Sequence, residues 1–179
     1  MIYFTMGDNM DKRFIPTYVS SNIYEVYFNK VKELGYKTLI IDLDNTLASP
    51  YIYEPDQRCI DLINKLKQME FQIIVLSNNK IERVEKFVKN LNVKAYADVK
   101  KPSTKKVSVY LKENNIDYSK ALILGDQVMT DVFMSNQLGI DVILFTPLTV
   151  KDEPITFVPR LFDKYFRKKI NKKNLAKEF

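Results

Sequence analysis

Apolar and polar positions follow two alternating periods along the chain, and this predicts repeated strand–helix units. Short continuous runs rich in Ile, Leu and Val are typical of buried strands, whereas apolar residues three or four positions apart are typical of amphipathic helices. The expected strands are residues 38–43, 71–76, 95–98, 121–125 and 141–145. The expected helices between them are residues 56–69, 80–90, 103–114 and 128–138, the last ending at Gly139. This order predicts a three-layer αβα, Rossmann-like α/β fold with a mainly parallel sheet.

A further helix is expected before the first of these strands. An apolar stripe at helical spacing predicts it, with residues 20–22 as its cap and Gly35 as its end. The stripe consists of Ile23, Tyr27, Phe28, Val31 and Leu34. We therefore expect one domain over residues 1–159, including this N-terminal helix, followed by a basic amphipathic helix or tail over residues 160–179.

The tail carries the whole charge excess of the protein. Its net charge of +6 equals that of the full chain, so residues 1–159 are neutral overall. Its basic residues are Arg160, Lys164, Arg167, Lys168, Lys169, Lys172, Lys173 and Lys177, against Asp163 and Glu178. An apolar stripe on one side of the expected helix contains Leu161, Phe162, Tyr165, Phe166 and Ile170. This pattern is typical of a helix at an anionic membrane surface, but a helix packed on its own domain has the same pattern, so both alternatives stay open.

Length and composition favour a compact protein without disulfides. The 179 residues include a single cysteine, Cys59, and no histidine, which excludes an internal disulfide and a His-based phosphatase. No apolar run approaches the roughly 20 residues that span a bilayer, and the N-terminus lacks the features of a signal peptide. We expect a cytoplasmic protein, peripheral at the inner face of the membrane if the tail binds lipid. No specific nucleic acid binding is expected, because the tail lacks the pattern of common nucleic-acid-binding modules.

Asp42 and Asp44 are the most informative residues, because they come at the carboxyl end of the strand predicted at 38–43. Ligands of open α/β sheets bind beyond the carboxyl ends of the strands. Two residues apart, these carboxylates leave the strand on the same side, and such a pair of like charges needs a compensating cation. Magnesium, which takes carboxylate and carbonyl oxygens, is the natural candidate.

Three more polar motifs follow later strands in a fixed order. They are Ser77-Asn78-Asn79, Lys100-Lys101-Pro102 and the segment from Gly125-Asp126 to Thr130-Asp131. Taken one at a time, Ser77 or Asn78 also fits a helix cap, either Lys100 or Lys101 fits the site, and Asp131 also fits the positive end of its own helix. Together, the four motifs in this order resemble those of the haloacid dehalogenase-like phosphohydrolases.

The resemblance implies a role for each motif residue and magnesium as the cofactor. Asp42 would be the nucleophile that forms an aspartyl-phosphate, and Asp44 would protonate the leaving group and then activate water. Lys101 would offset the charge of Asp42 and of the phosphate. The implied substrate-binding residues are Thr46, Ser77, Asn78 and Lys101, the metal site is Asp42, Asp44 and Asp126, and Asp131 is a supporting residue.

The motifs look like those of the YqeG branch of subclass IIIA in this superfamily, and Phe14-Ile15-Pro16 and Pro147-Leu148 extend the likeness. Mitochondrial relatives of that branch are phosphatidylglycerophosphate phosphatases, which implies a phosphorylated lipid headgroup as the substrate. The intervals between the motifs have no room for a cap domain, so we expect an open site. Two alternatives remain: a phosphatase of a nucleic acid end, a phosphoprotein or a small sugar phosphate, and a non-catalytic interaction protein that retains the fold.

Overall fold

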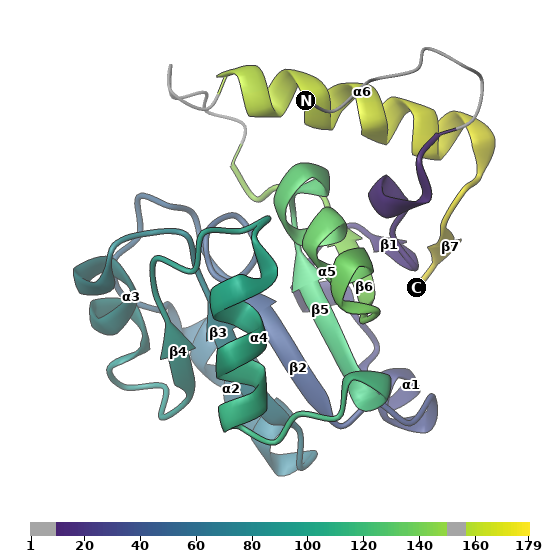
Figure 1. Cartoon of the computed structure of the whole chain (residues 1–179). Helices are drawn as coiled ribbons and strands as arrows, with labels where there is room; N and C mark the ends of the chain where they lie inside the picture. Colours follow the sequence, from purple (N-terminus) through teal and green to yellow (C-terminus); the bar gives the residue numbers. More distant parts are fainter. Residues whose placement is uncertain (1–9, 150–156) are drawn as a thin grey trace.

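A parallel seven-stranded sheet forms the centre of the computed structural model, which describes residues 10–149 and 157–179 (Figure 1). Within the last helix, side chains are described from Phe162 onward. The strands are β1 Tyr18–Ser20, β2 Thr38–Asp42, β3 Gln72–Leu76, β4 Lys94–Tyr96, β5 Ala121–Gly125, β6 Asp141–Phe145 and β7 Lys177–Glu178. Their order across the sheet is β4-β3-β2-β5-β6-β1-β7, and every neighbouring pair is parallel.

Helices cover both faces of the sheet, which confirms the predicted three-layer α/β fold. The helices are α1 Phe28–Glu33, α2 Gln57–Gln68, α3 Ile81–Val88, α4 Thr104–Glu113, α5 Phe133–Leu138 and α6 Phe157–Lys173. Successive residues of a strand face opposite sides, so Leu39 and Ile41 of β2 belong to the core cluster that includes residues of α1, α2 and α3, whereas Ile40 belongs to the cluster that includes residues of α4, α5 and α6. The sheet is therefore buried on both faces, as its continuous apolar strands predict.

The strand order reverses direction between β2 and β5. From β2 the chain moves to β3 and β4 on one side, whereas β5 and β6 lie on the other. Such a switch point is where open α/β sheets bind ligands. The pairing of Ile41 with Leu124 brings Asp42 and the segment after Gly125 out of the sheet side by side. Neither the loop from Leu43 to Asp56 nor the interval between β3 and α4 holds an inserted domain, as the short intervals between the motifs predict.

The prediction for the N-terminal helix was wrong in part. The chain forms β1, then a 3-10 turn at Ile23–Glu25 (η2), and only then the short helix α1. Val26 has an extended backbone, with φ −68° and ψ 128°, which places its side chain in the core and breaks the continuous helix. Tyr27 of the predicted stripe is exposed as a result.

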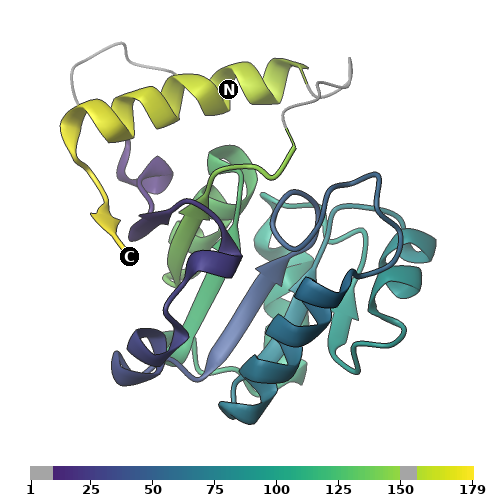
Figure 2. The ribbon, with the colours of Figure 1, turned by 180° about the vertical axis from the view of Figure 1, so that it is seen from behind.

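The C-terminal helix α6 begins at Phe157, before the predicted residue 160, and lies across the end of the molecule to which the strands point (Figures 1 and 2). Phe166 and Ile170 are buried against the domain, and the Phe166 ring stacks on Phe14 at a centroid distance of 4.5 Å. Packing on the domain therefore accounts for one side of the predicted stripe. The side chains of Arg160 and Leu161 lie outside the described residues.

A search of the described helices for a membrane-spanning segment gives a negative result, since none combines the required length with sufficient apolar character.

The short strand β7 follows α6 and pairs with β1 at the edge of the sheet. Neither β1 nor β7 is predicted from the sequence pattern.

Candidate active site

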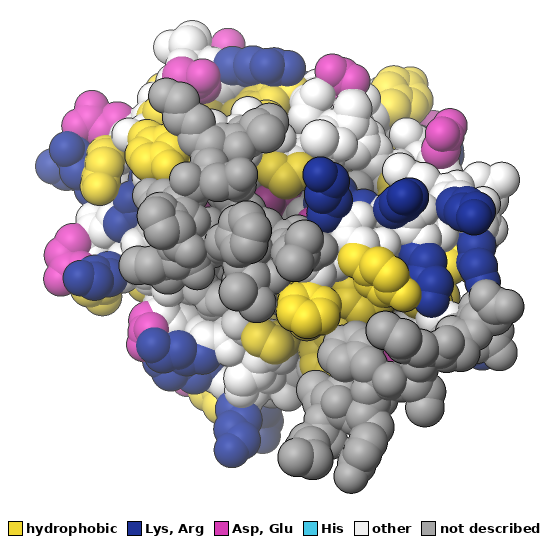
Figure 3. All heavy atoms as spheres, turned by 90° about the horizontal axis from the view of Figure 1, so that it is seen from above, with side chains coloured by type: hydrophobic (Ala, Val, Ile, Leu, Met, Phe, Trp, Pro, Cys, Tyr) yellow, Lys and Arg dark blue, Asp and Glu magenta, His cyan; other side chains and the backbone are white. Residues whose placement is uncertain are grey.

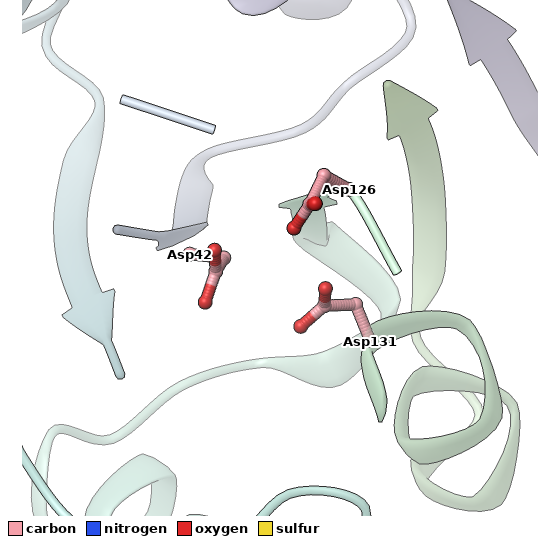
Figure 4. A group of neighbouring side chains, drawn as sticks. All are labelled: Asp42, Asp126 and Asp131. Atoms are coloured by element: carbon pink, nitrogen blue, oxygen red, sulfur yellow. The ribbon is translucent and has the colours of Figure 1, made fainter. Parts of the chain in front are cut away.

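Three buried carboxylates meet beyond the carboxyl ends of β2 and β5 (Figure 4). Asp42 is the last residue of β2, Asp126 directly follows β5, and Asp131 lies in the π-helical turn η4, Val128–Val132. One carboxylate oxygen from each side chain lies within 4.8 Å of one from each of the other two. Their side chains point toward one another in Figure 4, so residues from three sequence positions form one acidic cluster.

Among the described residues, Lys101 is the cation whose side chain contacts this cluster directly. Its Nζ donates to Asp42 Oδ1 and, at 2.7 Å, to Asp131 Oδ1, and its side chain is only 3% exposed. Lys100 lies on the surface instead, with 67% of its side chain exposed and an ion pair to Asp98. Of the two lysines in the motif, Lys101 therefore faces the site.

The charges in the cluster do not balance. Burial raises the pKa of Asp42 to about 7, although the Lys101 ammonium opposes this shift. Burial also raises the pKa of Asp126 well above its usual range, and the neighbouring Asp42 and Asp131 carboxylates raise it further. Burial alone would lower the pKa of Lys101, but Asp131 and Asp42 outweigh it and raise that pKa. Three carboxylates facing one ammonium form an oxygen-rich, negatively charged site whose donors suit a hard divalent cation.

The Asp44 side chain lies outside this cluster and has its own set of donors. Ser77 Oγ and Asn79 Nδ2 donate to Asp44 Oδ2 at 3.2 and 3.4 Å. Arg83 Nη2 donates to Asp44 Oδ1 at 3.1 Å. Because both carboxylate oxygens are engaged, Asp44 is held in one orientation, with 20% of its side chain exposed. The two motif carboxylates thus have different environments.

The Ser77-Asn78-Asn79 motif organises its surroundings as well as facing the site. Ser77 Oγ accepts a hydrogen bond from the Asn79 amide at 3.0 Å, so it caps the turn before α3 and contacts Asp44 at the same time. The Asn78 side chain bonds both the N–H and the C=O of Lys101, at 2.7 and 2.9 Å. Asn78 therefore positions the lysine through its side chain, which leaves its backbone amide as its candidate contact to a phosphate.

Thr46 lies in the turn after Asp44 and is buried. Among the described residues, its Oγ1 has no hydrogen-bond partner, and the same holds for Oδ1 of Asn45. Asn45 has a left-handed backbone, φ +67°, which asparagine tolerates and which turns the chain back after β2. Because buried polar atoms are nearly always hydrogen-bonded, Thr46 Oγ1 is a candidate contact for a bound ligand.

Asp131 belongs to the site rather than only to its own helical turn. Its Oδ2 accepts from the Gln127 amide at 3.1 Å, while its Oδ1 accepts from Lys101. The side chain packs directly on Gly125, where an added Cβ would lie only 2.5 Å from Asp131 Cγ. Close approach to Asp131 therefore requires a glycine at the end of β5.

Sequence reasoning missed several residues that hold this site. Asn79 and Arg83 contact Asp44, and Asp163 and Arg167 of α6 contact the loop that carries Asp126. One signal was present, since Arg83 is a charged residue among the buried positions of α3. These contacts of α6 join residues 35 and 41 positions apart, and no local pattern predicts them.

Solved structures share this fold. The chain superposes on a protein from Listeria monocytogenes serotype 4b with a TM-score of 0.53 and 18% identity, covering 74% of this chain and 99% of that one. For a haloacid dehalogenase family enzyme from Bacteroides thetaiotaomicron, solved with magnesium and inorganic phosphate, the TM-score is 0.52 and the identity 16%, covering 69% of this chain and 100% of that one. At these identities the likeness establishes the fold.

Sequence relatives establish the family. The chain is 29% identical to the probable phosphatase YqeG of Bacillus subtilis (strain 168) over 147 residues, which are 82% of this chain and 86% of that protein. The model of the family described as mitochondrial PGP phosphatase matches residues 9–149. Since this match spans most of the chain and the fold agrees with it, the protein belongs to that family, in the YqeG group of haloacid dehalogenase-like phosphatases, and is a phosphoric monoester hydrolase.

Proposed function

We propose that this phosphatase hydrolyses phosphate monoesters with magnesium through an aspartyl-phosphate on Asp42. The observation that carries the proposal is the separation of the two motif carboxylates. Asp42 lies in the acidic cluster against Lys101, whereas Asp44 is held outside it by Ser77, Asn79 and Arg83. Two carboxylates in different environments can perform two different tasks, nucleophilic attack and proton transfer.

Asp42 and Asp126 are the carboxylates that would hold magnesium, with Asp131 in support. Both carboxylate oxygens of Asp44 are engaged elsewhere, so we assign to its backbone carbonyl any contribution of that residue to the metal site. Bound magnesium would supply positive charge that keeps the cluster ionised and offsets charge on the phosphate.

In the first step, an ionised Asp42 oxygen attacks phosphorus while the bond between phosphorus and the alkoxide oxygen breaks. For this step Asp44 must carry a proton on one oxygen, which turns from its donor in the free enzyme to the leaving oxygen, and Asp44 gives that proton to the leaving oxygen as the bond to phosphorus breaks. The Lys101 ammonium offsets negative charge at Asp42 and on the phosphoryl group. Ser77, the Asn78 amide and Thr46 are the donors that we assign to the phosphoryl oxygens.

In the second step, the now ionised Asp44 removes a proton from water as the water oxygen attacks phosphorus. The bond between phosphorus and the Asp42 oxygen breaks, which releases inorganic phosphate and regenerates the carboxylate of Asp42. One residue thus acts first as acid and then as base, because the chemistry of the second step reverses that of the first.

The substrate that we propose is phosphatidylglycerophosphate, which would yield phosphatidylglycerol. The family description supports it, and so does the absence of an inserted domain over the site, since a lipid headgroup must enter while its acyl chains stay outside. The outward side of α6 supports contact with anionic lipid at the inner face of the membrane, because exposed Lys164, Lys168 and Lys172 lie near exposed Phe162 and Tyr165. Figure 3 shows basic and hydrophobic side chains next to each other over this helix.

A substrate panel tests this proposal. It contains phosphatidylglycerophosphate in mixed micelles, glycerol 3-phosphate, a 5′-phosphorylated oligonucleotide and a phosphopeptide, with Asp42→Asn as the inactive reference. We expect magnesium-dependent release of phosphate with the highest kcat/KM for the lipid, and tighter binding to anionic than to neutral vesicles. A higher kcat/KM for the oligonucleotide, the peptide or glycerol 3-phosphate would contradict the lipid assignment.

A further inference from the structure

Two charged residues on the inward side of α6 contact the loop that carries Asp126. Asp163 and Arg167 are one helical turn apart, and Arg167 Nε donates to Asp163 Oδ2 at 2.6 Å. Both side chains are largely buried, with 12% and 23% exposed, respectively. A partly buried, hydrogen-bonded ion pair of this kind holds its geometry better than a pair on the surface.

The pair forms hydrogen bonds with the loop backbone on both sides of Gln127. Asp163 Oδ1 accepts a hydrogen bond from the Val128 amide at 2.5 Å. Arg167 Nη2 donates to the backbone carbonyl of Asp126 and, at 2.9 Å, to that of Phe145 at the end of β6. The backbone next to the Asp126 side chain is thereby tied to α6 and to the sheet.

This loop needs such support because regular structure ends at Gly125 and resumes only at Val128. The direction of the Asp126 side chain follows from the backbone of that short stretch. Replacing a group that orients a metal ligand typically lowers metal affinity by about 10- to 100-fold.

We propose that Asp163 and Arg167 are positioning residues for the magnesium site, so that α6 is a working part of the catalytic domain rather than a separate tail. The inference rests on the proposed function in one respect, the assignment of Asp126 as a metal ligand. It extends that function to a helix outside all four motifs.

Magnesium binding without substrate provides the test. It is measured by calorimetry and by the magnesium-induced rise in melting temperature. Arg167→Gln removes the donors to both carbonyls, and Asp163→Asn is a milder change that keeps a side-chain oxygen for the Val128 amide. We expect either variant to raise the magnesium dissociation constant, by about 10-fold for Arg167→Gln. Because the two residues act as one unit, the double variant should lose little more magnesium affinity than Arg167→Gln alone.

Two matched controls separate positioning from stability. Ile170→Val loosens the packing of the same helix and leaves the side chains of Asp163 and Arg167 in place, and Lys105→Gln removes an exposed charge from α4. We expect Ile170→Val to lower the melting temperature and neither control to change magnesium affinity.

Asp126→Asn distinguishes failure of this inference from failure of the proposed function. If Asp126→Asn abolishes magnesium binding while Arg167→Gln and Asp163→Asn bind as the wild type does, the positioning role is overturned and the metal assignment stands. Wild-type magnesium affinity in Asp126→Asn would overturn the metal assignment and this inference with it.

Discussion

Replacing Lys101 with methionine is the most informative single change, because it removes the ammonium that contacts the acidic cluster. Methionine keeps most of the volume of the side chain, so loss of charge is the main effect. Removing one partner of a buried ion pair costs about 3–5 kcal/mol, since the remaining charge stays buried and uncompensated. Asp42 and Asp131 lose this partner together. Proton uptake by one of these carboxylates would relieve part of the cost of the uncompensated charge. We therefore expect a loss of stability near the lower end of this range, about 3 kcal/mol.

The pH dependence of this loss has a definite sign. Burial already raises the pKa of Asp42 to about 7, and removing Lys101 removes the main opposing influence. A carboxylate whose pKa is raised in the folded protein stabilises the fold at low pH and loses that contribution as the pH rises through the folded pKa. The destabilisation by Lys101→Met should therefore be larger at pH 8 than at pH 6.

The assay is thermal unfolding in EDTA at both pH values. For a chain of this length, 3 kcal/mol corresponds to a decrease of about 6–12 °C in melting temperature. The control is Lys100→Met, an exposed neighbour, which should change stability by less than about 0.5 kcal/mol. Equal decreases for the two variants, or a Lys101→Met protein as stable as the wild type at pH 8, would refute this reasoning.

Three further predictions concern other contacts of the site. Arg83→Gln should lower kcat for alkyl phosphates by roughly 10- to 100-fold, because Asp44 loses the donor to its Oδ1; this is less than the full contribution of a general acid. Arg83→Lys should recover part of the lost kcat. An equal loss for aryl phosphates would argue against this role of Arg83. Gly125→Ala should cost about 1–3 kcal/mol and weaken magnesium binding, because the new Cβ would displace Asp131; an unchanged melting curve would contradict this. Magnesium should bind more tightly at pH 8 than at pH 6, because Asp42, with a pKa of about 7, must lose its proton first; a dissociation constant independent of pH would count against Asp42 as a ligand.

The sequence predicts the central strands and the order of the site motifs because both are local patterns. A buried strand such as β2 has a continuous apolar run, and the polar residues that follow it mark the carboxyl edge of the sheet. Strands β1 and β7 were missed because they have only three and two residues and, unlike the equally short β4, do not follow a predicted helix within the alternating strand–helix order. The helix expected from Ile23 to Leu34 failed because its spacing fits a helix, whereas Val26 has to extend to reach the core.

The parts of the site that sequence could not predict depend on contacts between distant elements. The roles of Arg83 and Arg167 are set by which elements lie beside β2 and β5, and not by their neighbours in the chain. The choice between Lys100 and Lys101 likewise needs the direction of each side chain, which the structure gives. The sequence likewise could not separate packing on the domain from membrane contact for α6, because one apolar stripe contains both the side chains that are buried and those that are exposed.

The central proposal is that Asp42 carries the phosphoryl group during turnover. The most direct measurement is rapid quenching of the enzyme with substrate and magnesium, borohydride reduction and peptide mass spectrometry. Borohydride reduces an acyl phosphate to an alcohol, so phosphorylated Asp42 would be converted to homoserine. We predict this mass change at residue 42, growing with substrate concentration and absent without substrate. Full turnover with no modification at residue 42, or with the modification at Asp44, would contradict the proposed mechanism.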